Sequence, residues 1–121
     1  MKIHSAGLSR VGERERNEDR YAIARDDSLE AFILADGSGG HGAGDQAAER
    51  AVAAVAAGLP RQSAATPQAV RNLLTLAHEA VLEGQRTVST GRDMHATLVV
   101  VLVDTIRGLA SWGHVGDSRI Y

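Results

Sequence analysis

The chain has 121 residues, a formal net charge of −2 and no cysteine. This length fits one domain or part of one, and a chain without cysteine has neither disulfide bonds nor a thiolate nucleophile. The charge gives no electrostatic basis for binding nucleic acid or an anionic membrane. The N-terminal residues lack the apolar core of a signal peptide, and no apolar run approaches the length of a membrane span. We therefore expect a cytoplasmic protein.

The N-terminal part of the chain predicts antiparallel strands joined by short turns. Residues 3–9 and 21–24 have strand-like patterns, and a polar, charge-rich loop separates them over residues 10–20. Two consecutive aspartates and a serine then indicate a turn within residues 25–30. The run 31–35 is entirely apolar, which is consistent with a strand buried on both faces.

Two helices are expected next. Residues 45–57 are rich in alanine, with Asp45 as the expected N-cap and a Gly-Leu-Pro sequence as the stop. Thr66 is followed by proline, which predicts the start of a second helix. Its helical spacing of apolar residues continues to about Ser89, and a break is expected at residues 91–93.

Further strands follow the helices. Residues 96–104 are almost purely β-branched and leucine, the strongest strand pattern in the sequence. A tight turn at residues 107–108 leads to a partner strand over residues 109–115, in which Trp112 is expected to be a core residue. Residues 118–121 read as the start of another strand. The order of strands, helices and strands favours an α+β fold with antiparallel pairing over alternating β-α-β units.

Acidic residues are grouped where apolar runs meet loops. Glu18 and Asp19 precede a predicted strand, Asp36 ends the run 31–35, and Asp117 lies close to the last residue. Grouped carboxylates with glycines beside them offer the oxygen ligands and the room for water that a hard divalent cation needs. A single Asp-Gly pair is more simply a turn, but the three groups together favour a metal site.

The glycine-rich segment after Asp36 also has a competing interpretation. Residues 37–42 match G-x-G-x-x-G between a strand and a helix, as in dinucleotide-binding folds. Those folds need a parallel strand after the helix, with an acidic residue about 20 residues on. Here a second long helix comes next, and Asp36 would repel the pyrophosphate that a helix N-terminus should attract. The dinucleotide hypothesis is therefore disfavoured.

Four motifs together resemble the metal-dependent serine/threonine protein phosphatases, the type 2C (PPM) family in its compact bacterial form. They occur in the order of that family and span the whole chain: Arg14-x-x-Asn17-Glu18-Asp19, Asp36-Gly-Ser-Gly-Gly-His, Ala96-Thr-Leu-Val-Val and Val115-Gly-Asp117-Ser-Arg. The resemblance implies hydrolysis of phosphoserine and phosphothreonine in signalling proteins by water activated on two Mn or Mg ions. It also implies partners that are phosphorylated proteins, with a serine/threonine kinase of opposite action.

The resemblance assigns metal roles to five residues. Asp36 is similar to the carboxylate that bridges the two ions, and the Gly37 carbonyl to a ligand of one of them. Glu18 is similar to the acidic residue that holds the second ion through water, with Asp19 in a supporting role beside it. Asp117 matches the ligand of an additional third metal.

The resemblance also implies which residues handle the phosphate and the proton. Arg14 matches the arginine that grips the substrate phosphate, a task suited to its bidentate fork. Ser38 stands where relatives carry methionine or histidine. His41 is a nearby candidate proton donor, with a structural role in the loop as the alternative. Arg10 and Arg16 are assigned to a solvated loop.

Family members are roughly twice as long as this chain, and their later half supplies further aspartates to the first metal. The sequence is therefore expected to be the N-terminal portion of a single phosphatase domain over residues 1–121. The expected fold is α+β, an antiparallel β-sandwich flanked by helices in α-β-β-α layers, of which this chain is about half. Such a piece is expected to be inactive alone, and to self-associate or to be complemented by the missing half. The competing hypothesis is a non-catalytic regulatory module that binds metal or phosphopeptide.

Overall fold

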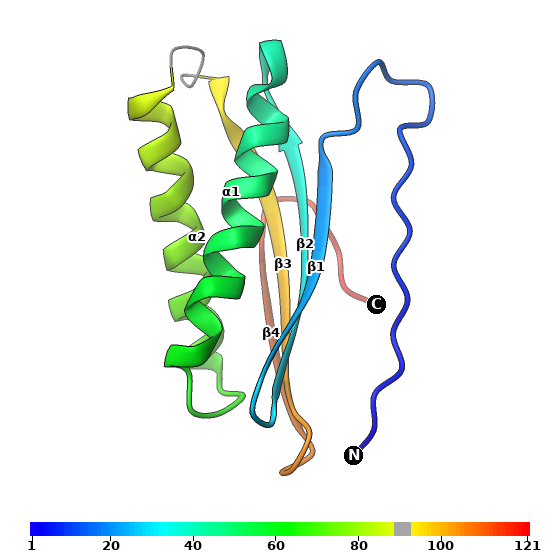
Figure 1. The fold of residues 1–121 in the computed structure, drawn as a ribbon, viewed down its shortest axis with the longest axis vertical. Helices are drawn as coiled ribbons and strands as arrows, with labels where there is room; N and C mark the ends of the chain where they lie inside the picture. Colours follow the sequence, from blue (N-terminus) through cyan, green and yellow to red (C-terminus); the bar gives the residue numbers. More distant parts are fainter. Residues whose placement is uncertain (89–92) are drawn as a thin grey trace.

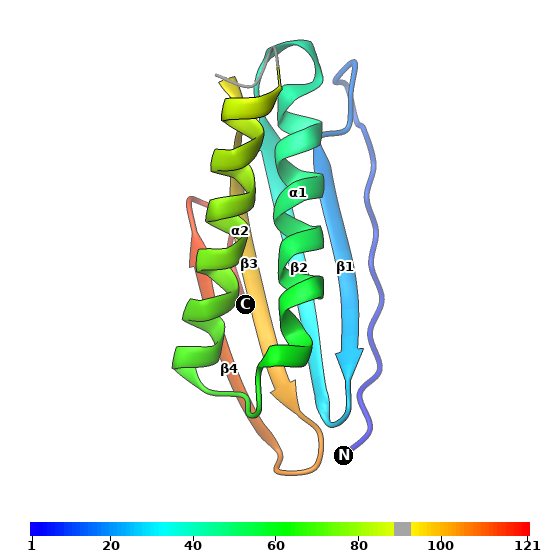
Figure 2. The ribbon, with the colours of Figure 1, turned by 60° about the vertical axis from the view of Figure 1, so that its left-hand side comes forward.

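The computed structural model describes residues 1–88 and 93–121 as one antiparallel sheet with two helices packed on one of its faces (Figures 1 and 2). The sheet has the order β1-β2-β3-β4. Its strands are β1 (Asp19–Asp26), β2 (Leu29–Ser38), β3 (His95–Asp104) and β4 (Leu109–Val115). Between β2 and β3 lie the short η1 (Gly40–Gly42), α1 (Ala43–Gly58), the short η2 (Leu59–Arg61) and α2 (Pro67–Thr87).

The α+β class and the antiparallel pairing predicted from the sequence are confirmed. The described residues form one sheet and one helical layer, which is half of the four layers expected. One face of the sheet is covered by α1 and α2, and we call the opposite side the open face. The open face sets the position of the acidic residues described below.

Two predicted strands are wrong. Residues 3–9 are extended beside β1, with Gly7 against the ring of Tyr21, but no backbone hydrogen bond between described residues joins them to a strand (Figure 1). Residues 118–121 do not continue the sheet, because the chain turns at Gly116, whose φ is 93°. The turn brings the Ser118 hydroxyl to 2.5 Å from the Thr97 hydroxyl. An extended sequence becomes a strand only where a neighbour accepts its backbone hydrogen bonds.

The burial along β2 follows the alternation of side chains in a strand. Leu29, Ala31, Ile33 and Ala35 point to the helices and are 0–3% exposed. Leu34 points to the open face and is 42% exposed, so the prediction of burial on both faces is wrong. Trp112, expected in the core, also lies on the open face and is 63% exposed. Both predictions assumed a cover on that face that the described residues do not provide.

The helix starts show one correct and one wrong prediction. Thr66 caps α2 as predicted, since its hydroxyl accepts a hydrogen bond of 3.1 Å from the Ala69 amide. The N-cap of α1 is Gly42 with a φ of 80°, and Asp45 instead lies in the first turn. The predicted end of α2 near Ser89 falls outside the described residues, as does most of the break expected at residues 91–93; the described part of α2 ends at Thr87.

Candidate metal and phosphate site

The register of the β1–β2 hairpin brings two of the predicted acidic residues together. Asp19 and Asp36 are direct partners across the two strands, and Thr97 of β3 is the next partner in the same row. Paired residues in an antiparallel sheet point to the same face, with β-carbons roughly 5 Å apart. Asp19 and Asp36 therefore extend side by side on the open face. β1 starts and β2 ends at the end of the sheet where α1 begins (Figure 1).

Glu18 and Gly37 are held by a close approach between β2, the start of β1 and the first turn of α1. The Gly37 amide donates a 3.0 Å hydrogen bond to the Glu18 carbonyl. A β-carbon on Gly37 would lie 1.9 Å from the Gly44 carbonyl oxygen, so no other residue fits there without moving the helix. The Glu18 carboxylate lies against Gly44, with one oxygen 2.6 Å from where a β-carbon on Gly44 would be.

One cavity of about 250 Å³ at this end of the sheet is lined by acidic and basic residues, including Arg14, Glu18 and Asp36 from the predicted site. Its lining consists of Arg10, Val11, Arg14, Arg16, Asn17, Glu18, Asp19 and Asp36. An adjacent hollow of about 770 Å³ shares Arg14, Arg16 and Glu18, and it also has His41 and the glycines of the loop along its wall. Acidic residues that can attract cations and arginines that can attract phosphate thus line the same cavity.

Arg10 and Arg16, expected in a solvated loop, are exposed as that expectation requires, and both also line this cavity. Arg16 also packs against Gly42, where its guanidinium lies 2.2 Å from the position of an added β-carbon. The sequence indicates their position only through the density of charged residues over residues 10–20, and ordinary surface loops have a similar density. Only the structure distinguishes an ordinary surface loop from one that lines a cavity, because it shows this loop lining the same cavity as Asp36.

The electrostatics of the cavity centre on Asp36. Its pKa is raised above the ordinary value of 3.8, first by partial burial and then by hydrogen bonding and charge repulsion from Asp19. Arg14 acts in the opposite direction, and the charge of Asp117 adds a further small increase. Two carboxyl groups that disfavour simultaneous ionisation are stabilised by a proton or a cation between them. This pair therefore fits a divalent cation.

Asp117 and His41 are near the site without lining the same cavity as Asp36. Asp117 lines a separate hollow of about 420 Å³ with Trp112 and His114, although its charge reaches Asp36. His41 is exposed in η1 with a φ of 55°. Within residues 1–88 and 93–121, no group of three histidine or acidic side chains is arranged to hold a metal ion. Glu18, Asp19 and Asp36 therefore converge on one cavity without forming a complete ligand set.

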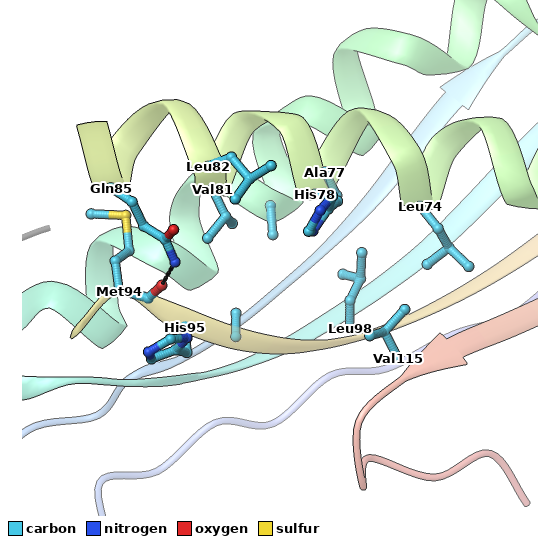
Figure 3. A pocket seen from close by; sticks show the side chains of 12 residues that line it. Leu74, Ala77, His78, Val81, Leu82, Gln85, Met94, His95, Leu98 and Val115 are labelled. Atoms are coloured by element: carbon cyan, nitrogen blue, oxygen red, sulfur yellow. Dashed lines mark hydrogen bonds between the residues drawn. The ribbon is translucent and has the colours of Figure 1, made fainter. Parts of the chain in front are cut away.

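A second kind of cavity lies between α2 and β3 (Figure 3). It measures about 230 Å³ and has mostly apolar walls, including Leu74, Val81 and Leu98. The Gln85 side chain closes one end by donating a 2.7 Å hydrogen bond to the Met94 carbonyl. No carboxylate lines this space, so it is separate from the acidic site.

Comparison with known proteins identifies the family to which this chain belongs. Residues 6–121 match the family model of protein phosphatase 2C, and the chain belongs to that family. Protein phosphatase PhpP of Streptococcus pneumoniae, from strains D39 and R6, is 33% identical over 120 residues. That match covers 93% of this chain and 47% of PhpP.

Solved structures show the same fold. A stage II sporulation E family protein from Thermanaerovibrio acidaminovorans aligns with a TM-score of 0.64 and 28% identity, over 81% of this chain and 44% of that one. A chain from a structure of the bacterial stressosome aligns with a TM-score of 0.65 and 23% identity. That alignment covers 91% of this chain and 48% of the other. The chain spans about half the length of the relatives it matches.

Proposed function

We propose that residues 1–121 are the N-terminal portion of a single phosphatase domain that hydrolyses phosphoserine and phosphothreonine in proteins. The observation that supports this most is the shared cavity of Arg14, Glu18, Asp19 and Asp36. Family membership adds to it, because residues 6–121 match protein phosphatase 2C. The share of PhpP that is matched, 47%, supports the assignment to one half of a domain.

The cofactors proposed are two Mn or Mg ions, with a third as an optional addition. Asp36 and the Gly37 carbonyl would hold the first ion, with Asp36 bridging to the second. Glu18 would hold the second ion through water, with Asp19 as a supporting group, and Asp117 would hold the third. When bound, such ions lower the pKa of a bound water and neutralise phosphoryl oxygens. The raised pKa of Asp36 beside Asp19 supports the fit.

Arg14 is the proposed phosphate-binding residue. It lines both the small cavity and the adjacent hollow, so a phosphate bound there can face the carboxylates while the peptide continues outward. Its planar guanidinium can donate two parallel hydrogen bonds to a phosphate. His41 lines the outer hollow, where an imidazole can hold a proton for the leaving serine or threonine oxygen.

The proposed partners are phosphorylated proteins in the cytoplasm, modified by a serine/threonine kinase of opposite action. Among the described residues, neither helix combines the length and the hydropathy needed to cross a bilayer. The net charge of −2 supports no role in nucleic-acid binding.

The alternative is a non-catalytic module that binds metal or phosphopeptide. It is favoured by one observation, the lack of a three-side-chain ligand set among the described residues. If the chain is half of a domain, the same observation has another cause, because the remaining ligands would come from the other half. The isolated 121 residues would then bind metal weakly and be inactive.

Hydrolysis of a phosphothreonine peptide, with Mn²⁺ and with a chelator, tests the proposal. We expect Mn²⁺-dependent turnover by the full-length protein, negligible turnover by residues 1–121 alone, and recovery when the separately expressed second half is added. Strong activity of the isolated chain would contradict the half-domain assignment. Phosphopeptide binding by a full-length protein that never hydrolyses would favour the non-catalytic module.

A further inference from the structure

The side chain of Arg20 connects the start of β1 to the first turn of α1. Its Nη1 donates hydrogen bonds to the carbonyls of Asn17 and Asp19, at 3.2 and 2.8 Å. Its Nη2 donates to the Asp45 carboxylate in α1. Arg20 pairs with the buried Ala35 in the sheet, so its side chain lies on the helix side, whereas Asp19 extends to the open face. One guanidinium thus joins two elements behind the acidic cavity.

These bonds fix the backbone on both sides of Glu18. Three successive carbonyls have donors: those of residues 17 and 19 accept from Arg20, and that of Glu18 accepts from the Gly37 amide at 3.0 Å. The Asn17 side chain completes the arrangement, since it accepts a 3.0 Å hydrogen bond from the Asp19 amide. It also donates one of 2.6 Å to the Ser9 hydroxyl. Arg20 therefore supplies two of the hydrogen bonds that hold the peptide groups around Glu18 and Asp19.

Asp45 holds the guanidinium in place for this task. It lies in the first turn of α1, where a carboxylate is favoured by the helix dipole. Neither Arg20 nor Asp45 lines the acidic cavity or the adjacent hollow. Both side chains thus lie behind the lining of the cavity and can act on a bound cation or phosphate only through the residues that form it.

We propose that Arg20 and Asp45 are positioning residues that hold the Asp19 carboxylate, and the backbone that carries Glu18, at the cation site beside Asp36. This inference rests on the proposed function, because it assumes that the carboxylates bind a divalent cation. Groups that orient metal ligands from behind typically change metal affinity by about 10–100-fold when they are removed. The alternative is an ion pair that only ties β1 to α1 and adds to stability.

Mn²⁺ binding and unfolding, measured on the same variants of the full-length protein, separate the two roles. Mn²⁺ affinity follows from the electron paramagnetic resonance signal of the free ion during titration, and stability follows from urea unfolding. We expect Arg20→Gln to weaken Mn²⁺ binding by about tenfold or more, and Asp45→Asn to weaken it by less. The matched control is Glu30→Gln, which removes the Arg25–Glu30 ion pair of 3.2 Å at the other end of the same hairpin. It should leave Mn²⁺ affinity unchanged.

A charge exchange sharpens the test. The double variant Arg20→Asp with Asp45→Arg restores an ion pair between β1 and α1, but an aspartate cannot donate to the carbonyls of residues 17 and 19. We expect partial recovery of the urea midpoint and no recovery of Mn²⁺ affinity. Recovery of both would overturn the positioning role, and so would Arg20→Gln or Asp45→Asn with wild-type Mn²⁺ affinity. A wild-type full-length protein that binds no Mn²⁺ at millimolar concentration would instead overturn the proposed metal site, and with it this inference.

Discussion

Replacing Gly37 by alanine is expected to force β2 away from the first turn of α1. The added methyl group would lie 1.9 Å from the Gly44 carbonyl oxygen and 3.0 Å from the Glu18 carbonyl oxygen. Ordinary contacts of a β-carbon begin near 3.4 Å, so the Gly44 oxygen would have to retreat by about 1.5 Å, the difference between 3.4 and 1.9 Å. This oxygen belongs to the backbone of a helix that packs on the sheet, and a close-packed interior does not absorb such a shift locally.

The expected cost follows from the kind of atom that obstructs the methyl group. Overpacking an interior costs roughly 1–3 kcal/mol, and a rigid backbone obstacle belongs at the upper end, so we expect Gly37→Ala to destabilise the chain by about 3 kcal/mol. Urea unfolding followed by circular dichroism measures this difference.

Gly40→Ala is the matched control for Gly37→Ala. It changes the same residue type three positions further along the loop, and an added β-carbon there meets nothing within 4 Å. We expect its stability to stay within about 0.5 kcal/mol of wild type. Equal unfolding midpoints for the two variants would refute the close approach of β2 and α1 that holds Glu18 and Gly37.

Three further predictions concern the substrate, a helix cap and pH. Arg14→Ala should raise KM for a phosphopeptide about tenfold or more with little change in kcat, because a hydrogen bond to a charged group contributes roughly 1.5–3 kcal/mol. A fall of about tenfold in kcat with an unchanged KM would count against phosphate binding in the ground state. Thr66→Ala should lower the free energy of unfolding by about 1 kcal/mol through loss of the α2 N-cap, and an unchanged urea midpoint would contradict the cap. The pKa of Asp36 is raised in the folded state, so ionisation of Asp36 opposes folding of the metal-free chain. Protonated Asp36 stabilises the fold below the ordinary pKa of 3.8, and this stabilisation is lost as pH rises through the folded pKa. Asp36→Asn should therefore gain stability relative to wild type between acidic and neutral pH in urea unfolding with a chelator, and a relative loss would contradict the sign.

Local signals explain why much of the fold could be predicted from the sequence. The Thr66-Pro67 pair marks the start of α2 by itself, because capping involves only the first helical turn. The β-branched run in β3 and the turn before β4 are equally local. Residues 3–9 have the composition of a strand, but strand formation depends on a neighbouring backbone that the sequence does not specify.

The site was predictable in part for a similar reason. Once the hairpin turn is placed at Asp27 and Ser28, the register makes Asp19 the partner of Asp36. The sequence located that turn only within residues 25–30, and a shift of one residue would move Asp19 to the other face. The family resemblance gave Asp19 only a supporting role, although it lies directly opposite Asp36.

The contact between Arg20 and Asp45 had no local signal. The two residues are 25 positions apart, and Asp45 had a plausible assignment as an N-cap. The N-cap is instead Gly42, since the chain reaches α1 in a left-handed conformation that glycine adopts most easily. Only the packing of α1 against β1 reveals that Asp45 faces an arginine.

Asp36→Asn in the full-length protein tests the central claim, that Asp36 holds the metal of a phosphatase, most directly. The measurement is Mn²⁺-dependent turnover of a phosphothreonine peptide, beside Asp27→Asn, which removes the same charge at the opposite end of the β1–β2 hairpin. The account predicts that Asp36→Asn lowers turnover by more than about a hundredfold, while Asp27→Asn retains wild-type turnover. Equal Mn²⁺-dependent turnover of Asp36→Asn and wild type would contradict it.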